Sequence, residues 1–294
     1  MAIEPAYAAY RFGSAVARAL PERAVGPFSA GVGRLAARVM DDRRQMVRRH
    51  QLRVRPDLTE EELQRAVRAT FAHYTHYWVE SFRLPGTPPA VLDDRLHTEG
   101  ADHIFAALEA GKGCILAMPH LGAWEWSAFW LTSCHHVPVT AVVEAVEPPE
   151  LAAWFVGLRS KLGMEVVPLD AHAGTTAAKA LKANRVLALL SDRDVAGGGV
   201  EVDFFGERTT LPAGPATLAL RSGAPIVPAT TYFDGNVHFG VARPPLDTTR
   251  QGKLREDVAR ITQAMAHEFE AMIRRAPEQW HLLQPNWPSD HEVR

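Results

Sequence analysis

Cysteine and long apolar segments are scarce in this chain of 294 residues. The sequence contains 2 Cys, Cys114 and Cys134, which form no CxxC pair, so a disulfide-stapled fold is excluded. We expect both cysteines to be buried as small hydrophobic residues. So few thiols in a chain of this size suggest a reducing compartment. No stretch of about 18 apolar residues occurs, and Arg11 and Arg18 interrupt the first apolar segment. The sequence therefore predicts neither a membrane-spanning helix nor a secretory signal.

Several catalytic and cofactor motifs are also missing. The sequence has no GxGxxG, and the GKG at 111–113 lacks the upstream glycine and the Ser or Thr of a phosphate-binding loop. It has neither the GxSxG of an α/β-hydrolase nor the HExxH of a metalloprotease. Two histidine pairs, His73 with His76 and His135 with His136, lack a third ligand at metal spacing. We expect no bound metal and no cofactor.

The charge is nearly balanced overall but unevenly distributed. Residues 1–55 contain 11 arginines and four acidic residues, a local balance of +7, so the other 239 residues carry −9 of the total of −2. A basic segment on an acidic body indicates attraction to nucleic acid, an anionic bilayer surface or a phosphorylated ligand. Apolar residues between these arginines fit helices with one apolar face, which predicts an interfacial membrane segment or helices docked on the body.

The remaining chain is typical of an α/β fold. A long helix is predicted from about Leu58, with Thr59 and Glu62 as a capping box, and the PGTPP at 85–89 ends it. Beyond this point short apolar segments alternate with helix-like segments, which predicts a mostly parallel central sheet flanked by helices. The strand segments are 114–118, 137–143, 165–169, 186–190 and 225–229, with edge strands at 200–205 and 237–242. We expect a basic helical region, 1–90, and an α/β core, 91–294.

His120 is the first candidate catalytic residue. It stands in ILAMPHLGAWEW, where an apolar strand ends and a helix begins, and such positions face the ligand crevice of an α/β sheet. Glu125 follows five positions later. If it accepts a hydrogen bond from one imidazole nitrogen, the other nitrogen is left as a general base. A structural role for the His–Glu spacing is the alternative.

A second candidate region is the glycine-rich segment 191–215, SDRDVAGGGVEVDFFGERTTLPAGP. Its glycines predict a long loop after a buried strand, and long loops in compact domains are often functional. The loop carries Asp192, Arg193, Asp194 and Glu201. A helix then opens near Pro212, where free N–H groups are able to hold a phosphate or an oxyanion. The alternative is a solvated crossover with salt-bridged acids.

These blocks together resemble a known family. HLGAWE, GMEVVPL, the block from SDRDVAGGGVEVDFFGE to SGAPIVPA, and a Gln-Trp-His at 279–281 are similar in type and order to the bacterial acyltransferases that acylate glycolipids, the lipid A acyltransferase group. The sequence motifs DRD and GVEVDFFGE favour the members of this group that act on phosphatidylinositol mannosides. The resemblance implies transfer of a long acyl chain from acyl-CoA to a sugar hydroxyl, for the mannoside enzymes the 6-position of a mannose. Alternatives are a lipid A-type or other lysophospholipid acyltransferase and a non-catalytic lipid-binding protein.

The resemblance also suggests roles for individual residues. His120 would be the general base, and Glu125 or Glu201 would orient its ring; the sequence leaves both open. Arg193 is expected to pair with a phosphate of CoA or of the inositol lipid, with Asp194 beside it in the substrate site. Backbone N–H groups near Gly206 or at the helix near Pro212 are candidates for the oxyanion hole.

The partners implied by the resemblance are lipids and acyl-CoA. Trp124, Trp126, Phe204 and Phe205 are candidates to line an apolar acyl channel, with plain core packing as the alternative. The basic segment would bind the anionic cytoplasmic leaflet, which predicts a peripheral protein on the cytoplasmic face of the plasma membrane. No recognised nucleic-acid-binding module accompanies the arginines, so nucleic acid is not an expected partner.

Overall fold

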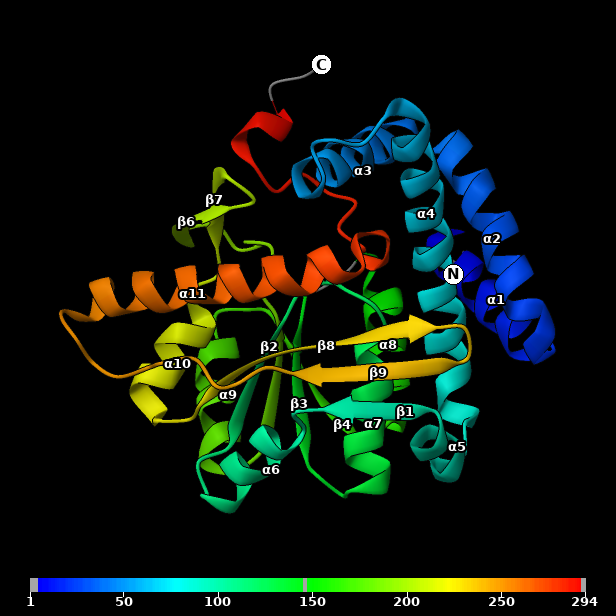
Figure 1. Ribbon diagram of the computed structural model, residues 1–294. Helices are drawn as coiled ribbons and strands as arrows, with labels where there is room; N and C mark the ends of the chain where they lie inside the picture. The colour runs from blue at the N-terminus through cyan, green and yellow to red at the C-terminus, as the bar shows by residue number, and fades with distance from the viewer. Residues whose placement is uncertain (1–4, 145–146, 292–294) are drawn as a thin grey trace.

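The N-terminal part of the chain forms helices that pack around one long helix. The computed structural model describes residues 5–144 and 147–291 and is drawn in Figure 1. The helices here are α1 (Pro5–Ala19), α2 (Glu22–Val39), α3 (Asp41–Val54) and α4 (Glu60–Arg83), followed by the 3-10 helix η1 (Leu84–Gly86). The predicted capping box of α4 is confirmed, because Thr59 Oγ1 accepts from the Glu62 N–H and the Thr59 N–H donates to the Glu62 carboxylate. The division at residue 90 stays a prediction.

Helix α2 approaches α4 closely along a stripe of mostly small residues. Its buried side chains recur every four residues, at Val25, Ser29, Gly33 and Ala37. A Cβ atom at position 33 would lie 2.6 Å from the backbone nitrogen of Ala72 in α4. Only glycine therefore allows this spacing, and the opposite face of α2 is left facing outward.

A seven-stranded sheet forms the centre of the molecule, which confirms the predicted α/β class. Its strands are β1 (Leu96–Glu99), β2 (Cys114–Met118), β3 (Val139–Val143), β4 (Met164–Pro168), β5 (Val186–Leu190), β8 (Ile226–Asp234) and β9 (Val237–Ala242). Their order is β1-β9-β8-β2-β5-β3-β4. The strands from β8 to β4 are parallel, whereas β9 is antiparallel to β8 and carries β1 parallel to itself.

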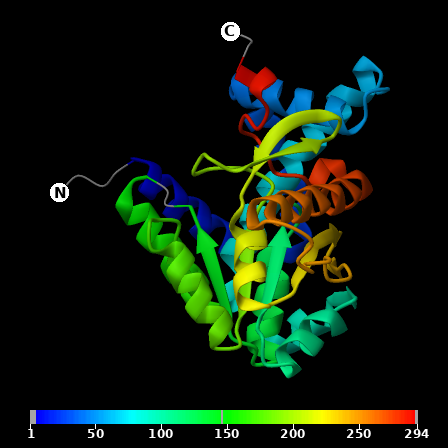
Figure 2. The ribbon, with the colours of Figure 1, turned by 90° about the vertical axis from the view of Figure 1, so that its left-hand side faces the viewer.

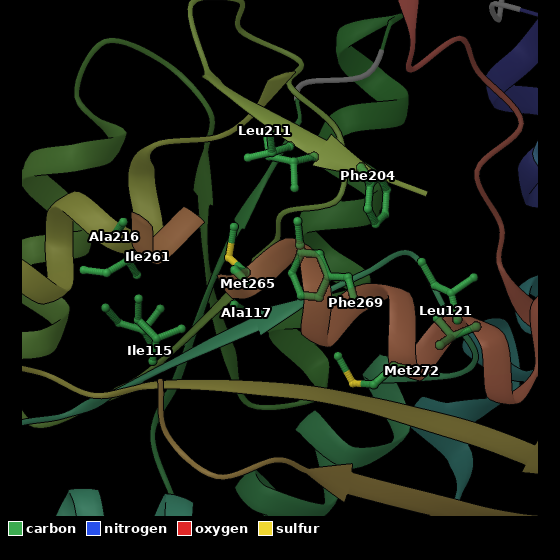
Figure 3. Close-up of a cluster of buried hydrophobic side chains, with 14 of the residues drawn as sticks. Ile115, Ala117, Leu121, Phe204, Leu211, Ala216, Ile261, Met265, Phe269 and Met272 are labelled. Atoms are coloured by element: carbon green, nitrogen blue, oxygen red, sulfur yellow. The ribbon is translucent and has the colours of Figure 1, made fainter. Parts of the chain in front are cut away.

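Helices cover both faces of the sheet, as Figures 1 and 2 show. They are α5 (Pro89–Asp94), α6 (Asp102–Glu109), α7 (Trp124–Cys134), α8 (Pro149–Lys161), α9 (Ala173–Lys182), α10 (Gly214–Ser222) and α11 (Leu254–Arg275). Side chains of β2 alternate between the two cores. Ile115 and Ala117 join the cluster with α9, α10 and α11 that Figure 3 shows, whereas Leu116 and Met118 face α6 and α7.

Two of the predicted edge strands lie elsewhere. Segment 200–205 forms β6 (Val200–Phe204), which pairs with β7 (Glu207–Leu211) in a separate antiparallel hairpin above α11 (Figure 1). Its turn consists of Phe205 and Gly206, both with positive φ, as a tight two-residue hairpin requires. Segment 237–242 is an inner strand, because β1 covers its outer side. The strands β1 and β7 were not predicted, since LHTE and ERTTL lack an apolar run.

The C-terminal segment after α11 returns to α3. It contains the 3-10 helices η2 (Pro277–Gln279) and η3 (Pro288–His291). His50 of α3 contacts the carbonyl oxygen of Leu282 at 2.9 Å, and Arg53 pairs with Asp290 at 2.8 Å and with Glu207 at 2.9 Å. Part of the basic segment is thus docked on the body, one of the two predicted alternatives. Within the described ranges, no helix has the length and apolar character needed to cross a membrane.

Candidate active site

Two neighbouring parallel strands bring His120 and Asp192 together. Met118, the last residue of β2, is the register partner of Leu190, the last residue of β5. His120 and Asp192 each lie two residues beyond these ends, at the carboxyl edge of the sheet where α/β proteins bind ligands. This adjacency confirms the position expected for His120 and adds a carboxylate that the sequence placed only in the loop.

The two side chains form a short hydrogen-bonded pair, called here the dyad. His120 Nδ1 lies 2.5 Å from Asp192 Oδ1. The other carboxylate oxygen, Oδ2, accepts from the backbone N–H of His120 at 3.0 Å and from Trp280 Nε1 at 2.8 Å. The Asp192 side chain is fully buried, whereas 36% of the His120 side chain is exposed. One end of the dyad is fixed and the other faces solvent.

The electrostatics keep Asp192 ionised. Burial alone would raise the pKa of this carboxyl, but the His120 imidazole, the two hydrogen bonds from His120 and the one from Trp280 together bring it below its ordinary value. An ionised carboxylate only accepts hydrogen bonds, so the proton of the imidazole is on Nδ1. Nε2 then carries the lone pair, and no hydrogen bond engages it among the described residues. This arrangement leaves Nε2 able to accept a proton.

The backbone around His120 is held by the C-terminal segment. The N–H of His281 donates to the carbonyl oxygen of His120 at 2.7 Å, and the N–H of Gly122 donates to that of Gln279 at 3.0 Å. Gly122 has φ +66, and a Cβ atom there would overlap the carbonyl oxygen of Thr231. The turn that presents His120 therefore requires glycine. His281 itself is buried, which lowers its pKa well below the ordinary value, with nearby histidines adding to the effect.

Glu125 does not orient His120, which corrects one of the two predicted carboxylates. It is buried in the first turn of α7, and its Oε1 accepts from the Tyr77 hydroxyl at 2.8 Å and from Arg159 at 2.9 Å. Burial raises the pKa of Glu125, and Arg159 opposes this effect. Because α7 starts only at Trp124, His120 lies outside this helix. The Glu125 side chain therefore points to α4 and α8 and not toward His120.

Glu201 does not reach the dyad either. It lies on β6, where 78% of its side chain is exposed, and its ion pair is a distant one of 3.9 Å with Arg208 across the hairpin. The prediction that this strand brings Glu201 beside His120 is wrong, because β6 belongs to the hairpin and not to the edge of the main sheet.

A groove of about 520 Å³, lined mostly by polar residues, begins next to Asp192 in the chain; Arg193 and Asp194 line it as part of the expected substrate site, and Glu201 lines it as well. Asn286 also lines the groove and donates to the carbonyl oxygen of Asp192 at 2.9 Å. Arg193 pairs with Glu144 at 3.0 Å. Asp194 accepts hydrogen bonds from two backbone N–H groups of the glycine loop, so its carboxylate shapes this loop.

The four aromatic residues expected to line one acyl channel are separated by the sheet. Trp124 lines a narrow apolar cavity of about 50 Å³ between α7 and strands β2, β5, β8 and β9. Trp126 lies outside it, stacked on His238 at a ring distance of 3.8 Å. Phe204 and Phe205 pack under the hairpin on the opposite core, where Phe204 stacks on Trp287. For Phe204 and Phe205, core packing is what the structure provides, whereas Trp126 also lines a separate cavity of about 420 Å³ between the N-terminal helices and the core.

The histidine pairs and cysteines take no part in the dyad. Across residues 5–144 and 147–291, no three His, Cys, Asp or Glu side chains are grouped so as to hold a metal ion. Cys114 and Cys134 are both free; Cys114 is buried as expected, and Cys134 is half-buried.

The sequence patterns indicated neither the contact of Trp280 with the site nor the role of Asp192. One signal was available for Asp192: it follows its strand by the same two residues as His120. That signal requires knowing that β2 and β5 are neighbours, which the order of segments in the chain does not reveal. The signal for Trp280 was its place in the Gln-Trp-His at 279–281, which belongs to the family resemblance but does not indicate a contact with Asp192.

Comparisons with known proteins identify the family of the chain. The model of the bacterial lipid A biosynthesis acyltransferase family matches residues 4–289. The chain is 39% identical over 285 residues to the phosphatidylinositol mannoside acyltransferase of Mycolicibacterium smegmatis, covering 96% of this chain and 91% of that protein. It is 38% identical over 288 residues to the enzyme of the same name from Mycobacterium tuberculosis, covering 96% and 88%. The chain therefore belongs to the bacterial lipid A biosynthesis acyltransferase family.

Proposed function

We propose that this protein transfers a long acyl chain from acyl-CoA to a sugar hydroxyl of a phosphatidylinositol mannoside, at the 6-position of a mannose. The observation that carries the proposal is the dyad, in which Asp192 holds Nδ1 of His120 at 2.5 Å and leaves Nε2 toward solvent. The names of the two mycobacterial relatives support the choice of acceptor.

The chemistry needs one base and no covalent acyl-enzyme. His120 Nε2 takes the proton of the attacking hydroxyl as its oxygen bonds to the thioester carbonyl carbon. The tetrahedral intermediate then collapses, the carbon–sulfur bond breaks, and the leaving CoA sulfur receives the proton from the imidazolium. Asp192 stabilises the imidazolium in between, as the acid of a catalytic triad does. The oxyanion donors, near Gly206 or at the start of α10, stay a prediction.

The polar groove is our candidate for the phosphate-bearing part of a substrate. Arg193 lies in it, and a guanidinium suits a phosphate group. Arg193 is already paired with Glu144, so a phosphate of CoA or of the inositol lipid would displace or share that partner. Asn286 of the groove donates to the backbone carbonyl oxygen of Asp192, so a substrate with its phosphate in the groove would extend past Asp192 to reach His120.

The apolar cavity is our candidate for the acyl chain. Its lining is almost entirely apolar and runs from Met118 and Trp124, which flank His120 in the chain, to Leu131 and Val139. A long acyl chain fills several times the 50 Å³ of this cavity. The proposal therefore requires lining side chains to move when the acyl chain enters.

Helices α1 and α2 are our candidate for contact with the anionic cytoplasmic leaflet, at which the protein would act as a peripheral enzyme. Phe12, Leu35 and Val39 are 73%, 60% and 71% exposed. Arg34 and Arg38 are exposed beside the latter two on α2. Exposed large apolar side chains flanked by arginines are typical of interfacial helices, and each nearby arginine adds about 1 kcal/mol of attraction to an anionic leaflet.

An acyl transfer assay tests the proposed function. Wild type and His120→Ala are incubated with acyl-CoA and a mannosylated phosphatidylinositol, with lipid A precursor as a second acceptor. His172→Ala, which removes an exposed imidazole at the start of α9, is the matched control. We expect transfer to the mannoside by wild type and control and a loss of at least about 100-fold in His120→Ala. Equal rates for His120→Ala would reject the mechanism, transfer to lipid A precursor alone would reject the acceptor, and lipid binding without any transfer would favour a non-catalytic protein.

A further inference from the structure

Trp280 contacts the carboxylate of the dyad on the side away from His120. Its Nε1 donates to Asp192 Oδ2 at 2.8 Å, and the residue is 1% exposed. A buried carboxylate is stable only when both oxygens receive hydrogen bonds. Oδ1 receives one from the imidazole, so Oδ2 depends on this indole and on the backbone N–H of His120.

Trp280 is itself held rigidly. Its ring lies 5.3 Å from that of His50 on α3, 5.9 Å from that of Phe205 in the hairpin turn and 6.2 Å from that of Trp287. Its backbone forms an isolated antiparallel bridge with Leu121, next to His120. Three separate parts of the chain therefore fix the direction of one N–H bond.

We propose that Trp280 is a positioning residue of the dyad: its indole N–H fixes the rotation of the Asp192 carboxylate so that Oδ1 stays aimed at Nδ1 of His120. The proposal rests on the proposed function, because positioning matters for a base that reacts. The terminal torsion of an aspartate is broad and roughly two-fold, so the carboxylate rotates easily unless a second donor holds it. Small errors in the geometry of reacting groups are costly in rate.

The same hydrogen bond contributes to the charge state of the dyad. It is one of the interactions that bring the pKa of Asp192 below its ordinary value against the effect of burial. Its removal leaves a buried anion with one donor fewer, which favours the protonated form. A role in core packing alone predicts no such change, so the titration of Asp192 separates the two roles.

Trp287 provides a matched control in the same aromatic cluster. It is also 1% exposed, and its Nε1 donates to the carbonyl oxygen of Phe204 at 3.2 Å, not to Asp192. Trp280→Phe and Trp287→Phe therefore remove the same indole N–H and the same ring area from one cluster. Only the first removes a donor to the dyad.

The experiment is a carboxyl ¹³C NMR titration of ligand-free wild type and both variants, with Asp192 assigned by Asp192→Asn. We expect the midpoint for Asp192 to rise in Trp280→Phe and to stay at the wild-type value in Trp287→Phe. Unchanged midpoints in both variants, or equal rises in both, would overturn the proposal. Because no substrate is needed, a wild type that transfers no acyl group would count against the proposed function alone.

Two further readings accompany the titration. In the acyl transfer assay, kcat of Trp280→Phe falls about 10-fold with KM unchanged, since a hydrogen bond to a charged group is lost without a change in the substrate sites. If Trp280→Phe does not fold, the indole N–H signal of Trp280 is followed in the wild type. It should shift along the Asp192 titration and lose that shift in Asp192→Asn, and a pH-independent indole signal would contradict the proposal.

Discussion

Asp192 meets His120 from a strand that is 72 residues away in the chain, and its fully buried carboxylate holds Nδ1 of the half-exposed imidazole at 2.5 Å. The pair depends on the adjacency of β2 and β5, whose last residues are in register. Both residues follow these ends by the same number of positions. The geometry of the dyad is thus a property of the sheet and not of a local motif.

The first prediction separates Asp192 from the carboxylates that the sequence suggested. Asp192→Asn keeps the size of the side chain but removes the charge that fixes the tautomer of His120, so kcat should fall about 10²- to 10⁴-fold. Glu201→Gln, at a residue whose side chain is 78% exposed, should change kcat far less. Acyl transfer rates at saturating substrate give the comparison. A larger loss in Glu201→Gln would refute the assignment of the dyad.

The second prediction concerns the role of Glu125 in stability. Glu125 and Arg159 form a buried pair at 2.9 Å, so Glu125→Gln leaves a buried guanidinium without its charge partner. We expect the free energy of unfolding to fall by about 3 to 5 kcal/mol. Tyr77→Phe, which removes one hydrogen bond to the same carboxylate, should cost about 1 kcal/mol.

Urea unfolding of the single variants and of Glu125→Leu with Arg159→Met measures these effects. The double variant should recover part of the stability, because an apolar pair of similar volume carries no uncompensated charge. If the single and double variants are equally unstable, the ion pair does not account for the loss.

The third prediction is a pH dependence of stability that comes from Glu80. Burial alone would raise the pKa of Glu80, but His238 and His76 outweigh it and lower the pKa to about 2. A carboxyl with a lowered pKa in the folded state stabilises the protein above its unfolded pKa, near 4.5, and this contribution is lost as the pH falls toward 2. The shift corresponds to about 3 kcal/mol.

Unfolding free energies measured from about pH 6 to about pH 2.5, which crosses the unfolded pKa near 4.5 and approaches the folded pKa of about 2, check this effect. Glu80→Gln should flatten the decline below pH 4.5 relative to wild type. Glu109→Gln, the same change at an exposed position at the end of α6, should leave the slope unchanged. Parallel curves for wild type and Glu80→Gln would show that Glu80 carries no such linkage.

The fourth prediction uses the apolar cavity. Ala188 on β5 lines it, whereas its register partner Ala141 on β3 is equally buried but lies outside the lining. Ala188→Leu should reduce kcat/KM for long acyl-CoA more than for short acyl-CoA, because the added side chain occupies the cavity. Ala141→Leu should retain the wild-type ratio of long to short, although overpacking costs it about 1 to 3 kcal/mol of stability. A changed ratio in Ala141→Leu alone would place the acyl chain elsewhere.

The fifth prediction divides the contributions of α2 to membrane binding. Replacing Leu35 and Val39 by Asp removes exposed apolar area, so flotation with anionic vesicles should weaken at every salt concentration. Replacing Arg34 and Arg38 by Ala should lose about 2 kcal/mol at low salt and little at high salt, because salt screens exposed charges. Arg208→Ala, on the hairpin, is the control. Wild-type binding by both double variants would argue against α2 as the contact.

Local patterns predicted most of the elements, but not β1, β7 or the site. The apolar runs at 114–118 and 186–190 coincide with β2 and β5, and His120 lies, as expected, just beyond the first of them. The spacing to Glu125 misled, because α7 starts only at Trp124 and turns Glu125 toward Tyr77 and Arg159. The spacing of residues in the sequence relates only residues within one helix or strand. The partner of His120 instead lies beyond the end of a different strand.

By itself, the sequence determined the alternation of strands and helices, the uneven charge and the place of His120 at a strand end, because these follow from local composition and periodicity. Only the tertiary structure decided which acid meets the imidazole and which aromatic residue holds that acid. The order of strands in a sheet results from packing between segments far apart in the chain, and no local pattern records it. Asp192 and Trp280 reach His120 through that packing, from the loop after β5 and from the segment after α11.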